Sequence, residues 1–250
     1  MNIYTEAPSN WKDLEERTSK FLTELGYVCE IEKDIETVRG VVNVDVIAKS
    51  KEVPNTVVIC ECKCWNKAIP QTVIHSFRTV INDYGANFGI IISKKGFQSG
   101  AIEGVKNSNI LLFTWNEFQD YFKSKWIKKK TVEISKTTKP LYDYVSVAFR
   151  IFFKEEYNRL SSENLELFEQ LTQQHFDTAF YSSNHQYLSL ETGEFDIDMF
   201  EMMFNAAKKD FRKDFSSYED YFEFLIKNSK SGVKDFDKLF KKELRKTNLI

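Results

Sequence analysis

The 250-residue sequence lacks a long apolar run, an excess of either charge, and a leader-like N-terminus. No stretch approaches the roughly 18 apolar residues of a membrane-spanning helix. The first residues lack the basic and apolar segments of a signal peptide. The 35 basic and 37 acidic residues nearly cancel, so any nucleic-acid contact would need a local basic patch. We therefore expect a soluble cytoplasmic protein with no membrane partner.

Cysteine is also scarce, and its spacing excludes two common uses. Cys60, Cys62 and Cys64 alternate along one predicted strand, and Cys29 stands apart. Neighbouring residues on one face of a strand do not easily reach disulfide geometry. Structural zinc sites usually pair cysteines two residues apart with a second pair elsewhere, and this chain has no such pairs. We interpret the four as small apolar side chains in a reducing compartment.

The sequence does contain charged residues within two strongly β-branched runs, residues 41–48 and 56–65. A short polar loop joins the runs, which predicts an antiparallel hairpin. Glu61 and Lys63 then share one face of the second strand, and Asp45 lies on the first. Charged groups in apolar surroundings are usually paired or metal-bound. The pattern predicts a divalent-metal site, although a solvated salt bridge on an edge hairpin would fit the same spacing.

A helix is predicted before the hairpin, over about residues 10–25, with Ser9 or Asn10 as its cap. At 100° per residue one arc collects its mostly apolar positions, which are Trp11, Leu14, Thr18, Phe21, Leu22 and Leu25. Glu15 lies at the edge of this arc and Glu16 points toward solvent. Glu15 is therefore the acidic residue of this helix that we expect to reach the sheet.

The remaining pattern predicts an α/β domain over residues 1–125. Helices and strands alternate after the hairpin, as in the crossover units of a parallel sheet. The predicted elements are a strand at Tyr27–Lys33, a helix from Pro70 to Gly85, a strand at Phe88–Ser93, a helix through Ala101–Val105, a strand at Ile110–Thr114 and a helix at Asn116–Phe122. The expected fold is a mixed central sheet flanked by helices, antiparallel at the hairpin.

The second half is predicted to be an all-α accessory domain over residues 140–250. Residues 126–139 break the earlier pattern with a basic, Thr- and Ser-rich stretch, which indicates a linker or a phosphate-contacting arm. Helices are expected at Leu141–Tyr157, Asn164–Phe180, Asp198–Phe211, Ser216–Lys227 and Val233–Arg245. Their aromatic stripes indicate a helical core or a subunit interface. This domain is expected to serve oligomerisation, sensing or partner docking.

The predicted site has the groups that phosphodiester hydrolysis needs. Asp45 and Glu61 could hold Mg²⁺, with Mn²⁺ as a substitute, while water and phosphate fill the remaining positions. The ammonium of Lys63 could orient the attacking water and offset developing negative charge. Glu15 could bind through the water shell of the metal or hold a second ion.

These motifs resemble the Mrr-type restriction endonucleases of the PD-(D/E)xK nuclease superfamily. The resemblance covers roughly Asn10 to Phe122. It lies in the residues Leu14-Glu15-Glu16, Val44-Asp45-Val46-Ile47-Ala48, Cys60-Glu61-Cys62-Lys63-Cys64-Trp65 and Gly89-Ile90-Ile91-Ile92-Ser93. By position it implies that Asp45 and Glu61 bind metal, that Lys63 is catalytic, and that Glu15 and Gln71 match further site residues. One departure is Val42-Asn43-Val44, which stands where members often have glycines.

The resemblance implies a metal-dependent endodeoxyribonuclease of a restriction-endonuclease-like fold, in restriction or phage defence. We expect DNA as substrate, a homodimer, and a defence-system partner protein. Candidate phosphate contacts are Arg78, Lys94, Lys95, Lys128, Lys129 and Lys130. Two alternatives stay open: a non-catalytic nucleic-acid or protein-binding module on the same fold, and a nuclease that acts on RNA or branched DNA.

Overall fold

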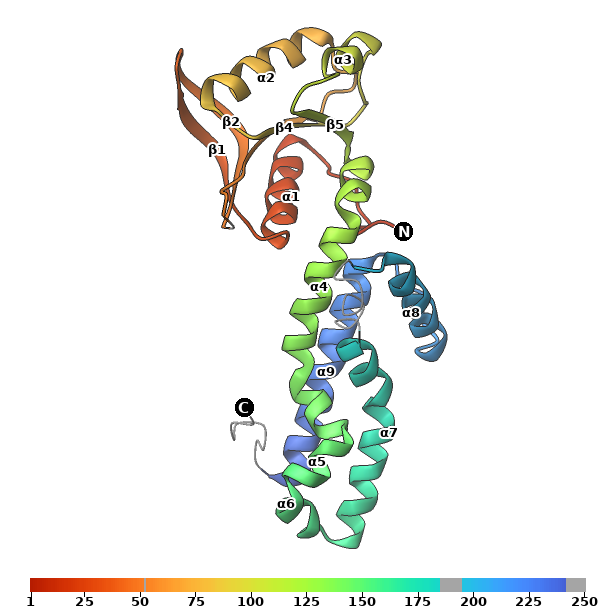
Figure 1. Cartoon of the computed structure of the whole chain (residues 1–250). Coiled ribbons are helices and arrows are strands. Elements are labelled where there is room, and N and C mark those ends of the chain that lie inside the picture. The colour runs from red at the N-terminus through yellow and green to blue at the C-terminus, as the bar shows by residue number, and fades with distance from the viewer. Residues whose placement is uncertain (52, 185–194, 242–250) are drawn as a thin grey trace. The chain divides into compact units, whose positions relative to one another are not determined.

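The computed structural model describes residues 1–51, 53–184 and 195–241, and it divides into two compact units (Figure 1). One unit consists of Asn2 and Tyr4–Trp126, and the other contains Met1, Ile3 and the chain from Ile127 onward. The division falls within one residue of the boundary expected at residue 125. Each unit is described separately.

The first unit contains a five-stranded mixed sheet in the order β1-β2-β3-β4-β5. The strands are β1 (Tyr27–Thr37), β2 (Gly40–Ser50), β3 (Val57–Lys63), β4 (Phe88–Ser93) and β5 (Ile110–Thr114). β1, β2 and β3 pair antiparallel, whereas β3, β4 and β5 pair parallel. The expected α/β architecture, with its antiparallel hairpin and its parallel second part, is confirmed.

Helices cover both faces of this sheet, with α1 on one face and α2 and α3 on the other (Figure 1). The helices are α1 (Trp11–Glu24), α2 (Gln71–Tyr84) and α3 (Ser99–Gly104). The side chain of Asn10 caps α1 by accepting a hydrogen bond from the N–H of Asp13. Gly85 ends α2 in the left-handed conformation, with φ of 75°. Asn10 is thus one of the two caps expected for the first helix.

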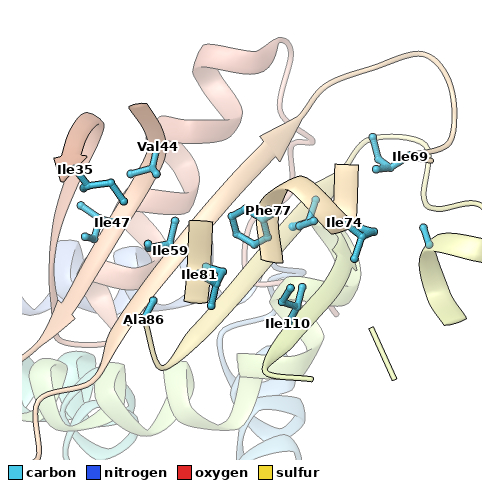
Figure 2. Close-up of a cluster of buried hydrophobic side chains, with 12 residues drawn as sticks. Ile35, Val44, Ile47, Ile59, Ile69, Ile74, Phe77, Ile81, Ala86 and Ile110 are labelled. Carbon is cyan, nitrogen blue, oxygen red and sulfur yellow. The ribbon is translucent and has the colours of Figure 1, made fainter. Parts of the chain in front are cut away.

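An aliphatic core fills the space between the sheet and α2, as Figure 2 shows. Ile47, Ile59, Ile74, Ile81 and Ile91 each expose 1% of their surface or less. Burial of one such side chain contributes about 1.5–3 kcal/mol to folding. This core holds β2 and β3 in place up to the point where their charged residues begin.

Helix α4 (Trp115–Val145) corrects the expected break at residues 126–139, because the helix runs through that entire segment. Apolar side chains recur inside it at helical spacing, with Trp126, Ile127 and Ile134 all buried. The hydroxyl of Thr138 donates to the carbonyl of Ile134, so its polar group is satisfied within the helix. The basic, Thr- and Ser-rich composition of residues 126–139 therefore led to a wrong prediction of their conformation. A linking role for the segment stays a prediction.

The second unit is helical in its described residues, as expected. Its helices after α4 are α5 (Val147–Phe152), α6 (Lys154–Asn158), α7 (Ser162–Asn184), α8 (Ile197–Asp210) and α9 (Tyr218–Phe240). The prediction of two helices at 216–227 and 233–245 is wrong, because α9 is continuous through Gly232. Residues 242–245 of the second predicted helix lie outside the described residues.

Many aromatic side chains of the second unit form its own core, although Phe152, Phe176 and Phe180 are exposed. Tyr144, Phe149, Phe168 and Phe236 are buried in one cluster and contact each other's rings. Of the two interpretations given by the sequence, the helical core is the one observed for these side chains. Among the described helices of both units, none is long and apolar enough to cross a membrane.

Candidate active site

The candidate site begins where the pairing of β2 with β3 ends. Val46 pairs with Cys60, and no further pair follows toward Asp45 and Glu61. Instead, the N–H of Cys62 donates to Oδ2 of Asp45 at 2.6 Å. The backbone of β2 offers no acceptor for the N–H of Cys62, and the carboxylate of Asp45 accepts this hydrogen bond instead. This contact anchors Asp45 beside the residues that follow on β3.

The alternation of side chains along β2 is interrupted at the same place. Val44 and Ile47 both belong to the core beneath α2, although strict alternation would place them on opposite faces. On β1, opposite Asp45, Glu32 has a left-handed backbone with φ of 47°. Both irregularities fall at the position of Asp45, and a strand pattern read from sequence reveals neither.

The ammonium of Lys63 joins the two acidic residues. Nζ of Lys63 lies 2.5 Å from Oε1 of Glu61 and 3.9 Å from Oδ2 of Asp45. Each of the three side chains exposes only about a fifth of its surface, with values of 19%, 20% and 23% for Lys63, Asp45 and Glu61. The structure thus brings together the three residues predicted to form the site.

Burial and the neighbouring charges have opposing effects on the pKa values of Glu61 and Lys63. Burial, reinforced by the charge of Asp45, raises the pKa of Glu61, and Lys63 only partly offsets this. Burial alone would lower the pKa of Lys63, but the contact with Glu61 and the charge of Asp45 outweigh it and raise that pKa. Lys63 is therefore held as an ammonium between two carboxyl groups.

Glu15 is the inward acidic residue of α1, as its place on the helix predicts. It exposes 4% of its surface, and its Oε2 atom is buried without a hydrogen-bond partner. Burial, together with the charges of Asp45 and Glu32, raises the pKa of Glu15 to about 7. A buried, unpaired carboxyl oxygen beside other acids is costly unless a cation or a proton neutralises it.

Two clefts meet at the site. A cleft of about 510 Å³ is lined by Glu15, Asp45 and Lys63, and a smaller one of about 320 Å³ by Glu61 and Lys63. Asn43 lines both. The three charged groups are therefore accessible from two sides of Lys63.

The other predicted site residues lie elsewhere or only near the edge. Lys94 lines the larger cleft and Lys95 is its exposed neighbour in sequence. Gln71 opens α2 and its side chain packs against Gly100 and Gly104 of α3; it lines neither of the two clefts.

The predicted phosphate contacts beyond the cleft have other surroundings. The guanidinium of Arg78 donates to the carbonyl of Gly104, so Arg78 holds α3 against α2. Lys128, Lys129 and Lys130 belong to the second unit, where Lys130 pairs with Glu133 at 3.2 Å. Arg78 lines neither of the two clefts, and phosphate contact by Lys128, Lys129 and Lys130 stays a prediction.

Several residues that line the larger cleft were not predicted as site residues, among them Trp11, Trp65 and Asn43. Periodicity places Trp11 on the mostly apolar arc of α1, yet 53% of its surface is exposed and it lines the cleft. Trp65 and Asn43 also line the cleft. The sequence signals that could have found them are the position of Trp65 two residues after Lys63 and of Asn43 two residues before Asp45.

The acidic groups of the site, Asp45, Glu61 and Glu15, suit a hard divalent cation. They supply oxygen ligands, which Mg²⁺ prefers, and Mg²⁺ is usually held by one or two carboxylates plus water. Glu15 adds a buried oxygen without a partner. Within residues 1–51, 53–184 and 195–241, no group of three or more His, Cys, Asp and Glu residues is arranged to hold a metal ion. Any cation here would therefore depend on water and substrate for much of its coordination.

Comparison with protein families finds a match over part of the chain. Residues 7–122 match the Mrr_cat family model, described as a restriction endonuclease. These are nearly the residues that carry the resemblance described above, which the match confirms. A search of curated proteins finds no match.

Solved structures offer weak likenesses. A protein of unknown function, AF1548, is 17% identical with a TM-score of 0.38, covering 42% of this chain and 59% of its own. A repair endonuclease from Pyrococcus abyssi is 18% identical with a TM-score of 0.32, covering 46% and 49%. AspBHI, a DNA modification-dependent restriction endonuclease, is 13% identical with a TM-score of 0.29, covering 50% and 39%. The chain spans less than two thirds of each of these proteins.

Proposed function

We propose, on the premise that residues 7–122 are a nuclease domain of the restriction endonuclease type, that this chain hydrolyses DNA phosphodiester bonds with a divalent cation. The observation that carries the proposal is the shared contact of Lys63 with Glu61 and Asp45 at the mouth of two clefts. A module that only bound DNA would gain nothing from holding two carboxyl groups where they repel phosphate.

The residues divide the chemistry between them. Asp45 and Glu61 would hold the cation, which we propose to be Mg²⁺ with Mn²⁺ as a substitute. When bound, such a cation lowers the pKa of water and stabilises charge on the phosphate. Lys63 orients the attacking water and offsets negative charge that develops on the phosphate. Glu15, which lines the same cleft as Asp45, can accept a proton, because its pKa lies near neutrality.

The test is cleavage of supercoiled plasmid, circular single-stranded DNA and RNA by the full chain with Mg²⁺, Mn²⁺ or EDTA. Wild type should cleave DNA with either cation and not with EDTA. Asp45→Ala and Lys63→Ala should each lose on the order of 10²-fold or more of the rate. The control is Lys106→Ala, an exposed lysine paired with Glu103 in α3.

Each alternative has its own outcome in this assay. Unchanged rates in both variants would reject the site. Binding of DNA without cleavage under any condition would favour the non-catalytic module. Cleavage of RNA alone would reassign the substrate.

We further propose a role in restriction or phage defence, in the cytoplasm, with a partner protein docking on the helical unit. Duplex cleavage needs attack on two strands, which is the reason to expect a homodimer. Most aromatic side chains of the second unit are buried in its own core, and exposed ones such as Phe152 and Phe176 remain for an interface. Sedimentation of the full chain at micromolar concentration tests the dimer, and a monomer would exclude it.

A further inference from the structure

The chain has four tryptophans, and the two exposed ones line the same cleft. Trp11 exposes 53% of its surface and Trp65 39%, whereas Trp115 and Trp126 expose 6% and 0%. The cleft that both exposed rings line is the one that contains Asp45 and Lys63. Apolar residues scattered singly on a surface need no explanation, but aromatic side chains gathered at a concave site indicate binding.

Trp65 is physically linked to the proposed reaction centre. Nζ of Lys63 lies 5.9 Å from the centroid of its ring, and Nζ of Lys67 lies 5.7 Å from it. These cation–π contacts hold the ring beside the lysine that faces both acids. In a nucleotide, one sugar separates the base from its phosphate. A base stacked on Trp65 would therefore leave its phosphate close to Lys63.

The charge of the cleft argues that its affinity does not come from phosphate contacts alone. Glu15, Glu32 and Asp45 line it against only Lys63 and Lys94. Proteins that grip continuous duplex rely on basic side chains that neutralise many phosphates. Stacking of bases on aromatic rings supplies affinity without positive charge, and it requires bases that are not already stacked and paired in a duplex.

We propose that Trp11 and Trp65 stack unpaired bases, so that the cleft takes DNA with a single-stranded stretch, as at gaps, flaps or melted sites. That such DNA is then cleaved rests on the proposed function. Binding by the two rings does not.

The test is binding of fluorescently labelled phosphorothioate DNA, which resists hydrolysis, by the full chain with Mg²⁺. An oligothymidylate, a duplex of equal length and a gapped duplex are compared at several salt concentrations. The variants are Trp11→Ala, Trp65→Ala and Trp65→Phe. The matched control is Phe88→Ala, because Phe88 is 46% exposed and lies at the opposite end of the parallel strands from Lys63. Circular dichroism confirms that each variant is folded.

Wild type should bind the oligothymidylate and the gapped duplex more tightly than the intact duplex, with quenching of tryptophan fluorescence. Each alanine variant should bind single-stranded DNA roughly 5- to 150-fold more weakly. Trp65→Phe should keep most of the affinity and Phe88→Ala all of it. The salt dependence should be unchanged in Trp65→Ala, since stacking releases no counterions.

Equal affinity of wild type and both alanine variants for single-stranded DNA would overturn the proposal. So would a preference of wild type for intact duplex, or failure to bind any of the three DNAs. The proposed nuclease function fails separately, if Asp45→Ala and Lys63→Ala cleave DNA as wild type does while the tryptophan variants lose binding.

Discussion

The carboxylate of Asp45 accepts a hydrogen bond from the backbone N–H of Cys62 at 2.6 Å. The contact crosses from β2 to β3 directly after their last paired residues, Val46 and Cys60. Asp45 therefore has two tasks: it holds the end of the hairpin together, and it presents its carboxylate to the cleft.

These two tasks should separate in the variants Asp45→Asn and Asp45→Ala. Both should lose cleavage, because neither offers a charged oxygen to a cation. Only alanine leaves the N–H of Cys62 without an acceptor, which costs about 1–3 kcal/mol when the group is buried. Thermal unfolding with EDTA should thus rank wild type and Asp45→Asn above Asp45→Ala. Equal unfolding temperatures for the two variants would contradict the anchoring role.

Replacement of Lys63 by methionine should uncouple cation binding from catalysis. The ammonium contacts Glu61 at 2.5 Å and so competes with any cation for that carboxylate. Lys63→Met should lose on the order of 10²-fold or more in cleavage rate. Its affinity for Mn²⁺, measured by titration calorimetry, should be equal to or higher than that of wild type. Lys106→Met serves as the control, and loss of Mn²⁺ binding in Lys63→Met would show that the lysine supports the metal site instead.

Glu15 should make the metal-free protein less stable as pH rises. Its pKa in the fold is raised to about 7 from an ordinary value of 4.5. A group whose folded pKa is raised contributes stability that is complete below the unfolded value and is lost as pH rises through the folded one. With EDTA present, the unfolding temperature of wild type should therefore fall relative to that of Glu15→Gln as the pH rises from about 5 to about 8.

The neighbouring variant Glu16→Gln is the control for this pH effect, because Glu16 is exposed on the same helix. Its unfolding temperature should follow that of wild type across the range. A constant difference between wild type and Glu15→Gln at every pH would mean that Glu15 does not titrate there.

Gly89 should tolerate no side chain. A Cβ atom at this position on β4 would lie 2.7 Å from Cε1 of Phe77 and 2.8 Å from Cγ1 of Ile81, both on α2. Gly89→Ala should lower the free energy of unfolding by about 1–3 kcal/mol through overpacking. At Gly104 the nearest atoms would be 3.7 Å away, so Gly104→Ala should change stability little. Denaturant unfolding of the two variants gives the comparison, and equal midpoints would contradict it.

Much of the first unit could be predicted because the residue types in its strands agree with the observed strand conformation. The β-branched run around Asp45 and the alternation of Glu61 and Lys63 with the cysteines identify the hairpin and its shared face without tertiary information. Cys60 and Cys62 are buried, as their pattern indicates. The left-handed backbone at Glu32, with φ of 47°, was not predictable, since no glycine in the sequence marks it.

The helical half was predicted less well because local signals were overridden by packing. Gly232 reads as a helix end, yet a Cβ there would lie 2.7 Å from Cδ1 of Leu141 and 2.9 Å from Cγ of His175. The glycine allows α9 to approach these side chains closely and the helix continues. In the first unit, Trp11 is exposed because it lines an open cleft, and helical periodicity does not reveal where a cleft lies.

The position of Lys63 has a consequence for the folding of the protein. Because its ammonium acts as an internal counterion for Glu61 and Asp45, we expect the chain to fold without a divalent ion. Chelation should therefore abolish the proposed cleavage activity without unfolding the protein, so that the supply of divalent ions would control the activity and not the stability.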